Sequence, residues 1–341
     1  MPNKDLSLVY LGKKGGGGHL ALALLEALKD LNPDFVYSNK NLFLEEKLRD
    51  GLSNIPTGLV QNLISFINPF RNKKLIREIS EQIKGSMVIF VMPHPLNLRI
   101  ISSLNNRNIF VIVHEAQKHK GDFWPTNFFL TRYITQRKCQ IITLSKFVAN
   151  DIYERHGLTV RVLPLIVPDF KRYYNFEIQK NLDIVHLGRH KKYKDYNFLI
   201  NGLRELSKEF TIFLNIPRKF HRTFIDKPKV ELTDKYLDEY NFLNTVARAK
   251  LVVITHTLAS QSGIIPIAVY FGTKIVCPEI GGLPEQFNQS QGTAYQPGSI
   301  ADFQSKIRAK LKNEFVEIEC ADDFARPWIS FVSEEISKCN V

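Results

Sequence analysis

The chain has 341 residues, of which 44% are apolar, with 18 Gly and 16 Pro. A single hydrophobic core seldom grows beyond roughly 250–300 residues, so two domains are expected, and this composition excludes a disordered or fibrous protein. The formal net charge of +12 predicts an anionic partner, and the surplus of basic residues is larger in the N-terminal half. A nucleic acid, an anionic bilayer, a phosphorylated substrate and a plain solvated surface all fit this charge. Because no nucleic-acid-binding motif is present, we do not expect a nucleic-acid partner.

The compartment is predicted from what the sequence lacks. The longest apolar runs, such as "LSLVYLG" and "NIFVIVH", are far shorter than the roughly 18 residues of a membrane-spanning helix. The N-terminal "MPNKDLSLVYLG" has neither the apolar segment nor the cleavage site of a signal peptide, so a cytoplasmic location is expected. The four cysteines lie far apart with no Cys-x-x-Cys pair, which favours reduced thiols over disulfides or a zinc site.

Short apolar runs alternate with helical patterns along the first half of the chain. Strands are expected at 6–11, 35–38, 87–92, 109–114 and 140–144. Helical stretches such as "HLALALLEALKDL" and "FVANDIYERHG" fall between them. This alternation is typical of βαβ units and a parallel sheet.

A second series of the same kind begins at "LDIVHLG" and continues through "FTIFLNI", "KVEL", "LVVITH" and "KIVC". Helical candidates between these strands include "YNFLINGLRELSK", "SGIIPIAVYFG" and "IADFQSKIRAKLK". Periodicity lapses at 163–181, where Pro164 and Pro168 punctuate the chain, so the linker is placed there. The predicted fold class is α/β, with two doubly wound parallel sheets in tandem and domains at 1–168 and 169–320.

One segment, "GLVQNLISFINPFRNKKLIREISEQIKG", does not fit the alternation. Its apolar residues recur at helical spacing and are followed by a basic cluster that includes Arg71, Lys73 and Lys74. Such a stripe can lie at an anionic membrane surface, which would make the protein a peripheral membrane protein. A helix packed against the core explains the stripe as well.

The first candidate site is the glycine-rich tract "LGKKGGGGHLALALLEAL", directly after the first strand. Glycines let the backbone approach a ligand closely, and the helix that follows offers free N–H groups to an anion. The spacing is not a Gly-x-Gly-x-x-Gly, so an NAD-dependent oxidoreductase is weakly supported, and a flexible turn is the plain alternative. The residues assigned to an acceptor and phosphate loop are Gly15, Gly16, Gly17, Gly18 and His19.

The second candidate is "IVHEAQKHKGD", at the end of the fourth strand. Side chains at the carboxyl ends of parallel strands face the crevice in which open α/β sheets bind ligands. His114, Glu115 and His119 could therefore orient a sugar hydroxyl or relay a proton. The spacing does not match His-Glu-x-x-His, so a metal site is not expected.

The third and fourth candidates lie in the second domain. Gly188, Arg189 and Lys194 follow its first strand, and their forked and compact cations suit a diphosphate, although a solvated basic surface is the alternative. In "LASQSGIIPIAVYFG", a loop ends and a helix begins at Ser262, Gly263 and Ile264, whose N–H groups could bind an anion. In the following "EIGGLPEQF", Gly282 permits close approach and Glu285 could bind hydroxyls.

Taken together, these stretches resemble the family-4 retaining glycosyltransferases, which have the GT-B fold. "GRHKKYKD" is similar to that family's diphosphate motif, with Asp195 where Gly is usual. "IITLSKFVANDIYERHG" resembles the segment that leads into the linker, and "ARPWISFVSEEISK" the final helix, 321–341, that crosses back onto the N-terminal domain. "VHEAQKHKGD" is similar to a His-Asp…His-x-Gly-Glu pattern found in a subgroup.

The resemblance implies two Rossmann-like domains facing a central cleft. It implies a nucleotide sugar held mainly by the C-terminal domain and a glycan or lipid-linked acceptor held mainly by the N-terminal one. Arg189 and Lys194 would then hold the diphosphate, with N–H groups of 262–264 beside them, and His114 would contact the transferred sugar. It further implies retention of stereochemistry, a role in cell-surface polysaccharide synthesis, and no bound metal or other cofactor.

The sequence departs from the family at its Glu-x7-Glu pair. Aligned on Gly263, the two positions hold Ser260 and Ala268, so neither supplies a carboxylate. A subgroup with a similar "SQSG" also lacks the pair, which keeps an active enzyme as the first hypothesis. A non-catalytic GT-B subunit that binds a partner or a glycan is the second.

Overall fold

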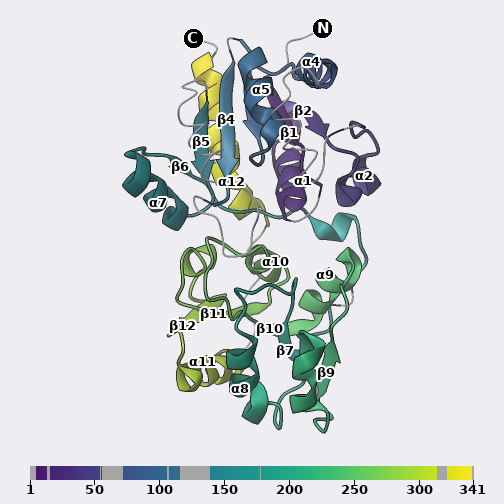
Figure 1. Ribbon diagram of the computed structural model, residues 1–341, viewed down its shortest axis with the longest axis vertical. Helices are drawn as coiled ribbons and strands as arrows, with labels where there is room; N and C mark the ends of the chain where they lie inside the picture. The colour runs from purple at the N-terminus through teal and green to yellow at the C-terminus, as the bar shows by residue number, and fades with distance from the viewer. Residues whose placement is uncertain are drawn as a thin grey trace. The chain divides into compact units, whose positions relative to one another are not determined.

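The computed structural model describes residues 5–13, 16–53, 55, 72–105, 107–115, 139–176, 178–312 and 321–339. These residues form two compact units, one of residues 1–169 with 322–341 and the other of residues 170–321. The chain thus leaves the first unit, builds the second and returns to the first with its last helix (Figure 1).

The first unit is built on a six-stranded parallel sheet with the order β2-β1-β3-β4-β5-β6. Its strands are β1 (Leu6–Tyr10), β2 (Asp34–Tyr37), β3 (Met87–Phe90), β4 (Asn108–Val113), β5 (Gln140–Thr143) and β6 (Arg161–Val162). Its helices are α1 (Gly17–Ala27), α2 (Leu42–Leu48), α4 (Lys73–Gln82), α5 (Pro95–Ser103), α7 (Lys146–His156) and α12 (Ala321–Cys339). The central strands β1 and β3 are buried along their whole length, as expected of a parallel sheet covered on both faces.

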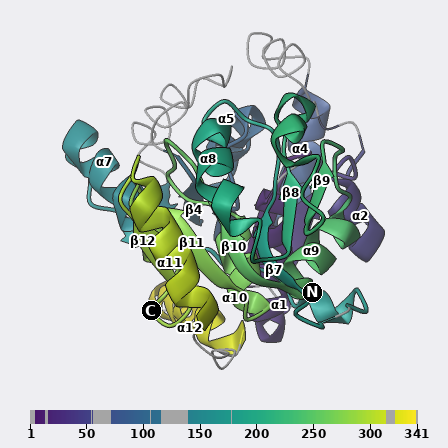
Figure 2. The same ribbon diagram turned by 90° about the horizontal axis from the view of Figure 1, so that it is seen from below.

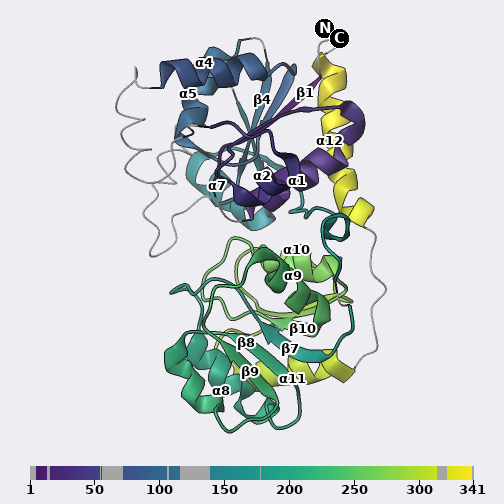
Figure 3. The ribbon, with the colours of Figure 1, turned by 90° about the vertical axis from the view of Figure 1, so that its right-hand side faces the viewer.

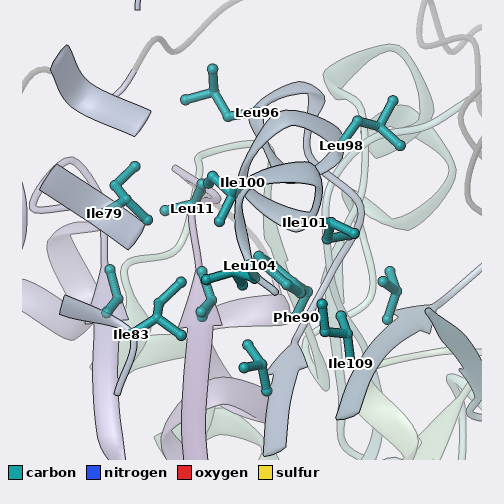
Figure 4. Close-up of a cluster of buried hydrophobic side chains, with 14 of the residues drawn as sticks. Leu11, Ile79, Ile83, Phe90, Leu96, Leu98, Ile100, Ile101, Leu104 and Ile109 are labelled. Atoms are coloured by element: carbon teal, nitrogen blue, oxygen red, sulfur yellow. The ribbon is translucent and has the colours of Figure 1, made fainter. Parts of the chain in front are cut away.

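Successive side chains of these strands point to opposite faces of the sheet and belong to two core layers. On one face, Val88 and Phe90 of β3 pack with Ile100 and Ile101 of α5, and Ile79 of α4 joins the same cluster (Figure 4). The opposite face is covered by α12. Phe331 of that helix meets Phe110 of β4 edge to face, with 5.1 Å between ring centroids. The helices therefore fix the sheet from both sides, as the double winding requires.

The second unit has a six-stranded parallel sheet with the order β12-β11-β10-β7-β8-β9. Its strands are β7 (Leu182–His186), β8 (Ile212–Asn215), β9 (Val230–Thr233), β10 (Ala249–Val253), β11 (Lys274–Pro278) and β12 (Gly292–Tyr295). Its helices are α8 (Tyr196–Leu206), α9 (Glu239–Arg248), α10 (Ile264–Tyr270) and α11 (Ile300–Lys312). In this unit α8 and α11 cover one face, while α9 and α10 cover the other (Figure 3). The helix α11 packs against β10, β11 and β12, and Figure 2 shows it beside β11 and β12.

The structure confirms two doubly wound parallel sheets and adds two strands that the sequence analysis did not predict. β6 has only two residues, too few to show a pattern. β12 begins at Gly292, which sits where any Cβ would lie 2.6 Å from the ring of Phe287. That glycine gives the strand "GTAY" the appearance of a turn. The predicted apolar stripe of residues 58–71 lies outside the described residues.

Candidate functional site

Each sheet has a point at which its strand order reverses, and such points are where open α/β sheets bind ligands. In the second unit the chain builds outward from β7 through β8 to β9 and then restarts on the other side of β7 with β10. The reversal therefore lies between β7 and β10. The segments that leave the carboxyl ends of these two neighbouring strands carry Gly188, Arg189 and Lys194 on one side and Ser262 on the other.

The two segments are joined directly. Lys194 and His256 form an isolated antiparallel β-bridge. The backbone N–H of Asp195 donates to the Thr255 carbonyl at 2.7 Å, and the N–H of Thr257 donates to the Tyr193 carbonyl at 2.7 Å. These bonds hold residues 193–195 against residues 255–257, so Lys194 lies at the reversal point itself.

Gly188 and Lys194 are interdependent. Gly188 has φ +106°, a backbone conformation that L side chains rarely adopt, and a Cβ there would lie 2.9 Å from the Lys194 ammonium nitrogen. That nitrogen donates to the Leu187 carbonyl at 2.7 Å, so it lies directly beneath the turn. The sequence analysis grouped these residues by motif, and the structure brings them into contact.

Lys194 is buried, with a relative exposure of 8%. Burial and, second, the nearby Arg189 guanidinium lower the pKa of Lys194 to about 7. Arg189 itself is exposed and has no hydrogen bond or ion pair with any described residue. The site thus holds one buried lysine and one exposed arginine, and neither is paired with a carboxylate among the described residues.

Two histidines that the sequence analysis did not single out belong to this site. His186 ends β7, and burial, followed by the charges of Lys194 and His256, lowers its pKa well below the ordinary value. The Nδ1 atom of His186 and the hydroxyl of Thr255 are buried without a hydrogen-bond partner among the described residues. His186 and His256 lie at or just beyond the carboxyl ends of strands, in "IVH" and "ITH". His114 was selected in the other domain because it follows a strand in the same way, so the same signal would have found these two histidines.

The start of α10 is partly occupied by a side chain. The N–H of Ser262 donates to Oε1 of Gln286 at 2.7 Å, and Nε2 of Gln286 donates back to the Ser262 carbonyl at 3.2 Å. Of the three N–H groups expected to contact a diphosphate, those of Gly263 and Ile264 have no partner among the described residues. Gln286 was not among the predicted site residues, although it adjoins Glu285 in the single-turn 3-10 helix Pro284–Gln286.

The loop after β11 carries the remaining predicted residues of this domain. Gly281 has φ +54°, which a glycine adopts without strain, and the neighbouring Gly282 is buried. Glu285 is exposed. Because β11 pairs with β10, this loop leaves the sheet at the same edge as Ser262.

In the first unit the strand order reverses between β1 and β3. The glycine tract follows β1 and begins α1, which has no side-chain N-cap and no acidic residue in its first turn. A Cβ at Gly17 would lie 2.9 Å from the ring of Tyr10, so this glycine is required by packing, whereas Gly16 faces open space. Gly18 is buried on α1, and the ring of His19 packs edge-on against Phe43 at 4.8 Å. Gly15 lies outside the described residues.

His114 follows β4, and its Nε2–H donates to the Val91 carbonyl beyond β3 at 3.0 Å. That bond places the ring beside the reversal point and leaves Nδ1 as the basic nitrogen. Burial lowers the pKa of His114, and the hydrogen bond to Val91 and the charge of Glu115 oppose this shift. At neutral pH the ring is therefore uncharged and suited to accept a proton or a hydroxyl hydrogen bond. His119 lies outside the described residues.

A further histidine, His94, caps α5 at the same edge. Its Nδ1 accepts the Leu96 N–H at 3.3 Å, so its proton is on Nε2. Asn97, in the first turn of α5, donates to the Met92 carbonyl at 2.9 Å. The "MPHP" that follows β3 carries the polar-end signal, but the sequence analysis passed over it.

Among the described residues, no three His, Cys, Asp or Glu side chains are grouped so that they could hold a metal ion. Within the same residues, no helix combines the length and apolarity needed to cross a bilayer.

No protein-family model matches the sequence, and no curated protein sequence matches it. Solved structures resemble the chain over nearly its whole length. A glycosyltransferase from Rickettsia africae is 14% identical, with a TM-score of 0.63 over 98% of this chain and 99% of that one. Anabaena HepE in complex with UDP-glucose is 13% identical, with a TM-score of 0.68 over 97% and 98%. A putative UDP-N-acetylglucosamine 2-epimerase from Listeria monocytogenes is 10% identical, with a TM-score of 0.67 over 98% and 97%.

At these identities the likeness shows the fold. The prediction of a GT-B fold with two Rossmann-like domains is confirmed by these neighbours together with the two parallel sheets. Membership of family 4 stays a prediction.

Proposed function

We propose that the chain is a glycosyltransferase that moves a sugar from a nucleoside-diphosphate sugar to a glycan or lipid-linked acceptor. The observation that carries the proposal is the pair of basic side chains at the reversal point of the second sheet, Lys194 and Arg189, which have no carboxylate partner among the described residues. A diphosphate is an anion of the size and charge that two such cations fit. The fold supports the proposal, since HepE with this fold forms complexes with UDP and with UDP-glucose.

In the proposed reaction the bond between the sugar and the diphosphate breaks, and negative charge grows on the departing phosphate oxygen. The sugar forms a new bond to an acceptor hydroxyl oxygen, whose proton is released to the departing phosphate or to solvent. Arg189 and Lys194 stabilise that charge, together with the N–H groups of Gly263 and Ile264, which have no partner among the described residues. Such preorganised stabilisation is often the largest single contribution to catalysis. We expect no metal requirement, because the two protein cations offset the diphosphate charge.

On the acceptor side, we propose that His114 contacts the transferred sugar and that the glycine tract of residues 15–19 lies by the acceptor. The uncharged His114 ring, anchored through Nε2 on Val91, supports this role. Retention of stereochemistry, action in cell-surface polysaccharide synthesis and work at the cytoplasmic face of a membrane are parts of the same proposal. They rest on the family resemblance and on the net charge of +12.

The test is release of nucleoside diphosphate by the purified protein from a panel of nucleotide sugars, with lipid and glycan extracts as acceptors. We expect release with at least one donor, at an unchanged rate when EDTA replaces divalent metal ions. Each nucleoside diphosphate is also tested for a thermal shift. A thermal shift with a nucleoside diphosphate, but no turnover with any of the acceptors, would favour the non-catalytic binding subunit. The absence of both a thermal shift and turnover would refute the transferase.

A further inference from the structure

The Lys194 ammonium nitrogen lies in an environment that disfavours its charge. The side chain is 8% exposed, and its only hydrogen bond to the described part of the chain is to the Leu187 carbonyl. A charged group removed from water normally needs a counter-ion, because one neutral hydrogen bond does not replace its hydration. Lys194 has no such counter-ion among the described residues.

The groups around Lys194 are mostly basic. The Arg189 guanidinium faces it from the same loop, His186 from β7, and His190 from the loop between them. His256 lies across the β-bridge, from the segment after β10. The tyrosines packed there are Tyr193, edge-on to His256, and Tyr196, edge-on to His186.

Two carboxylates of this part of the domain, Asp195 and Asp234, interact with other groups. One oxygen of Asp195 accepts the Phe198 N–H at 2.9 Å and so caps α8. Asp234 acts on His190. The groups around Lys194 therefore add positive charge and supply no ion pair. Such surroundings favour the neutral amine over the ammonium form of a lysine.

We infer that binding of a nucleoside diphosphate is coupled to uptake of one proton by Lys194, so that the buried amine becomes the ammonium partner of the phosphate only when the ligand is present. This inference rests on the proposed function, because it concerns the same site. The proton comes from the solvent and adds to the Nζ lone pair. It is given back when the nucleoside diphosphate leaves.

The sign of the pH dependence follows. With a ligand-free pKa of about 7 for Lys194, about nine in ten molecules carry the neutral amine at pH 8. A diphosphate beside the amine raises that pKa again, so up to about 0.9 proton is taken up per ligand at pH 8. Affinity should fall by about tenfold for each pH unit above 7 while the bound lysine stays charged.

The histidines of the site do not give the same result. Burial lowers the pKa values of His186 and His190 below the ordinary value of 6.5. Both rings are therefore neutral before binding at pH 8 and would need a much larger rise in pKa to take up a proton there. Uptake at pH 8 thus reports on the lysine.

The experiment is titration calorimetry at pH 8 in Hepes and in Tris, whose different ionisation enthalpies reveal the number of protons exchanged. The probes are UDP, GDP, ADP, CDP and dTDP, and the one that binds best is carried forward from pH 7 to pH 9. The wild-type protein is expected to take up to about 0.9 proton at pH 8, in line with its ligand-free pKa.

Three variants separate the possible sources of the signal. Lys194→Arg keeps a charge that does not titrate, and should bind with no uptake and with an affinity independent of pH between 7 and 9. Lys194→Met, close in shape, should bind weakly at every pH with no uptake. His190→Gln changes an exposed neighbour and should retain the uptake of the wild type.

Binding by the wild type without proton uptake would overturn the inference and leave the proposed function standing. Uptake that persists in both Lys194 variants would also overturn it, because the proton would then reside elsewhere. If no nucleoside diphosphate binds at any pH, the proposed function and the inference fail together.

Discussion

Gly188 shows how much a single residue without a side chain can determine. Its φ of +106° turns the chain at the end of β7, and its missing Cβ leaves room for the Lys194 ammonium nitrogen. The turn and the cation are therefore set by the same position. A side chain at position 188 would change both the turn and the position of the Lys194 nitrogen, and residues 187–194 would have to rearrange.

A test of this dependence compares two glycines of the second unit. Gly188→Ala should lower the free energy of unfolding by about 1–3 kcal/mol and also weaken nucleoside diphosphate binding, because the new methyl group strains the backbone and displaces Lys194. Gly298→Ala is the control, since Gly298 also has positive φ (+82°) but open space around it. It should cost stability only. Equal ligand affinity in the two variants would contradict the role given to Gly188.

Arg189 carries the complementary prediction. Because it is exposed and unpaired among the described residues, Arg189→Ala should leave the melting temperature unchanged. It should remove hydrogen bonds to a charged ligand worth about 1.5–3 kcal/mol, a loss of roughly 10- to 150-fold in nucleoside diphosphate affinity, and abolish turnover. Arg204→Ala is the matched control, an exposed arginine on α8, roughly 12 Å along the helix axis from its first residue, Tyr196. Normal turnover in Arg189→Ala would show that the diphosphate is held elsewhere.

At the scale of elements, the loop between β10 and α10 is fixed from outside by Gln286. Its amide pairs with both the N–H and the carbonyl of Ser262, in the way that a strand neighbour would. The loop is therefore held in one conformation by a neutral side chain, close to the place where the family resemblance leads one to expect an acid.

Gln286→Glu should weaken nucleoside diphosphate binding by about tenfold, with little change in melting temperature. The carboxylate can still accept the Ser262 N–H but cannot donate to its carbonyl, and it brings a negative charge near the ligand, a combined effect of about 1–2 kcal/mol. Gln289→Glu, at an exposed position three residues on, adds the same charge without the pairing and serves as control. Binding at wild-type strength in Gln286→Glu would refute this role of the amide.

Trp328 is one of the residues that attach the helix α12 to the first unit. Its side chain is fully buried, and its Nε1–H donates to the Pro164 carbonyl at 2.8 Å. Trp328→Ala should lower the free energy of unfolding by about 3–5 kcal/mol, measured by urea denaturation followed by circular dichroism. Ile329→Ala, on the exposed side of the same helix, should change it by less than about 1 kcal/mol. Similar midpoints for the two variants would show that α12 contributes little.

Sequence patterns predicted the elements that have continuous apolar runs and the site residues that lie in sequence beside them. Arg189 and Lys194 could be placed at a strand end because "LDIVHLG" reads as a buried strand. The contact of Gln286 with Ser262 could not be predicted, because it joins residues 24 apart in the sequence through a loop whose path depends on tertiary packing. The displacement of the Lys194 pKa also could not be predicted, because it depends on burial that only the folded loop creates.

At the scale of the whole molecule, stability should depend on pH through two lysines of the second unit, the buried Lys194 and the partly buried Lys180. Burial lowers the pKa of Lys180 to about 7, as it does for Lys194. Since the unfolded chain binds these protons up to about pH 10.4, it holds more protons than the folded chain above pH 7. Stability of the ligand-free protein should therefore rise from pH 7 to pH 9 and lose no further contribution from these lysines below pH 7.

The measurement is the urea midpoint at pH 7 and pH 9 for the wild type and for Lys194→Met. The variant should show a smaller rise, because one of the two titrating groups is gone. An equal rise in both proteins would mean that Lys194 carries its charge in the folded, ligand-free state.

The return of α12 to the first unit also has a consequence for the order in which the protein can be made. Synthesis proceeds from the N-terminus, so all of residues 170–321 leave the ribosome before the helix that covers Phe110 exists. Until then the face of β4 that receives Phe331 has no cover from α12. The second unit is continuous in the chain and can fold during this wait, which makes the N-terminal unit, although it is translated first, the last to be completed.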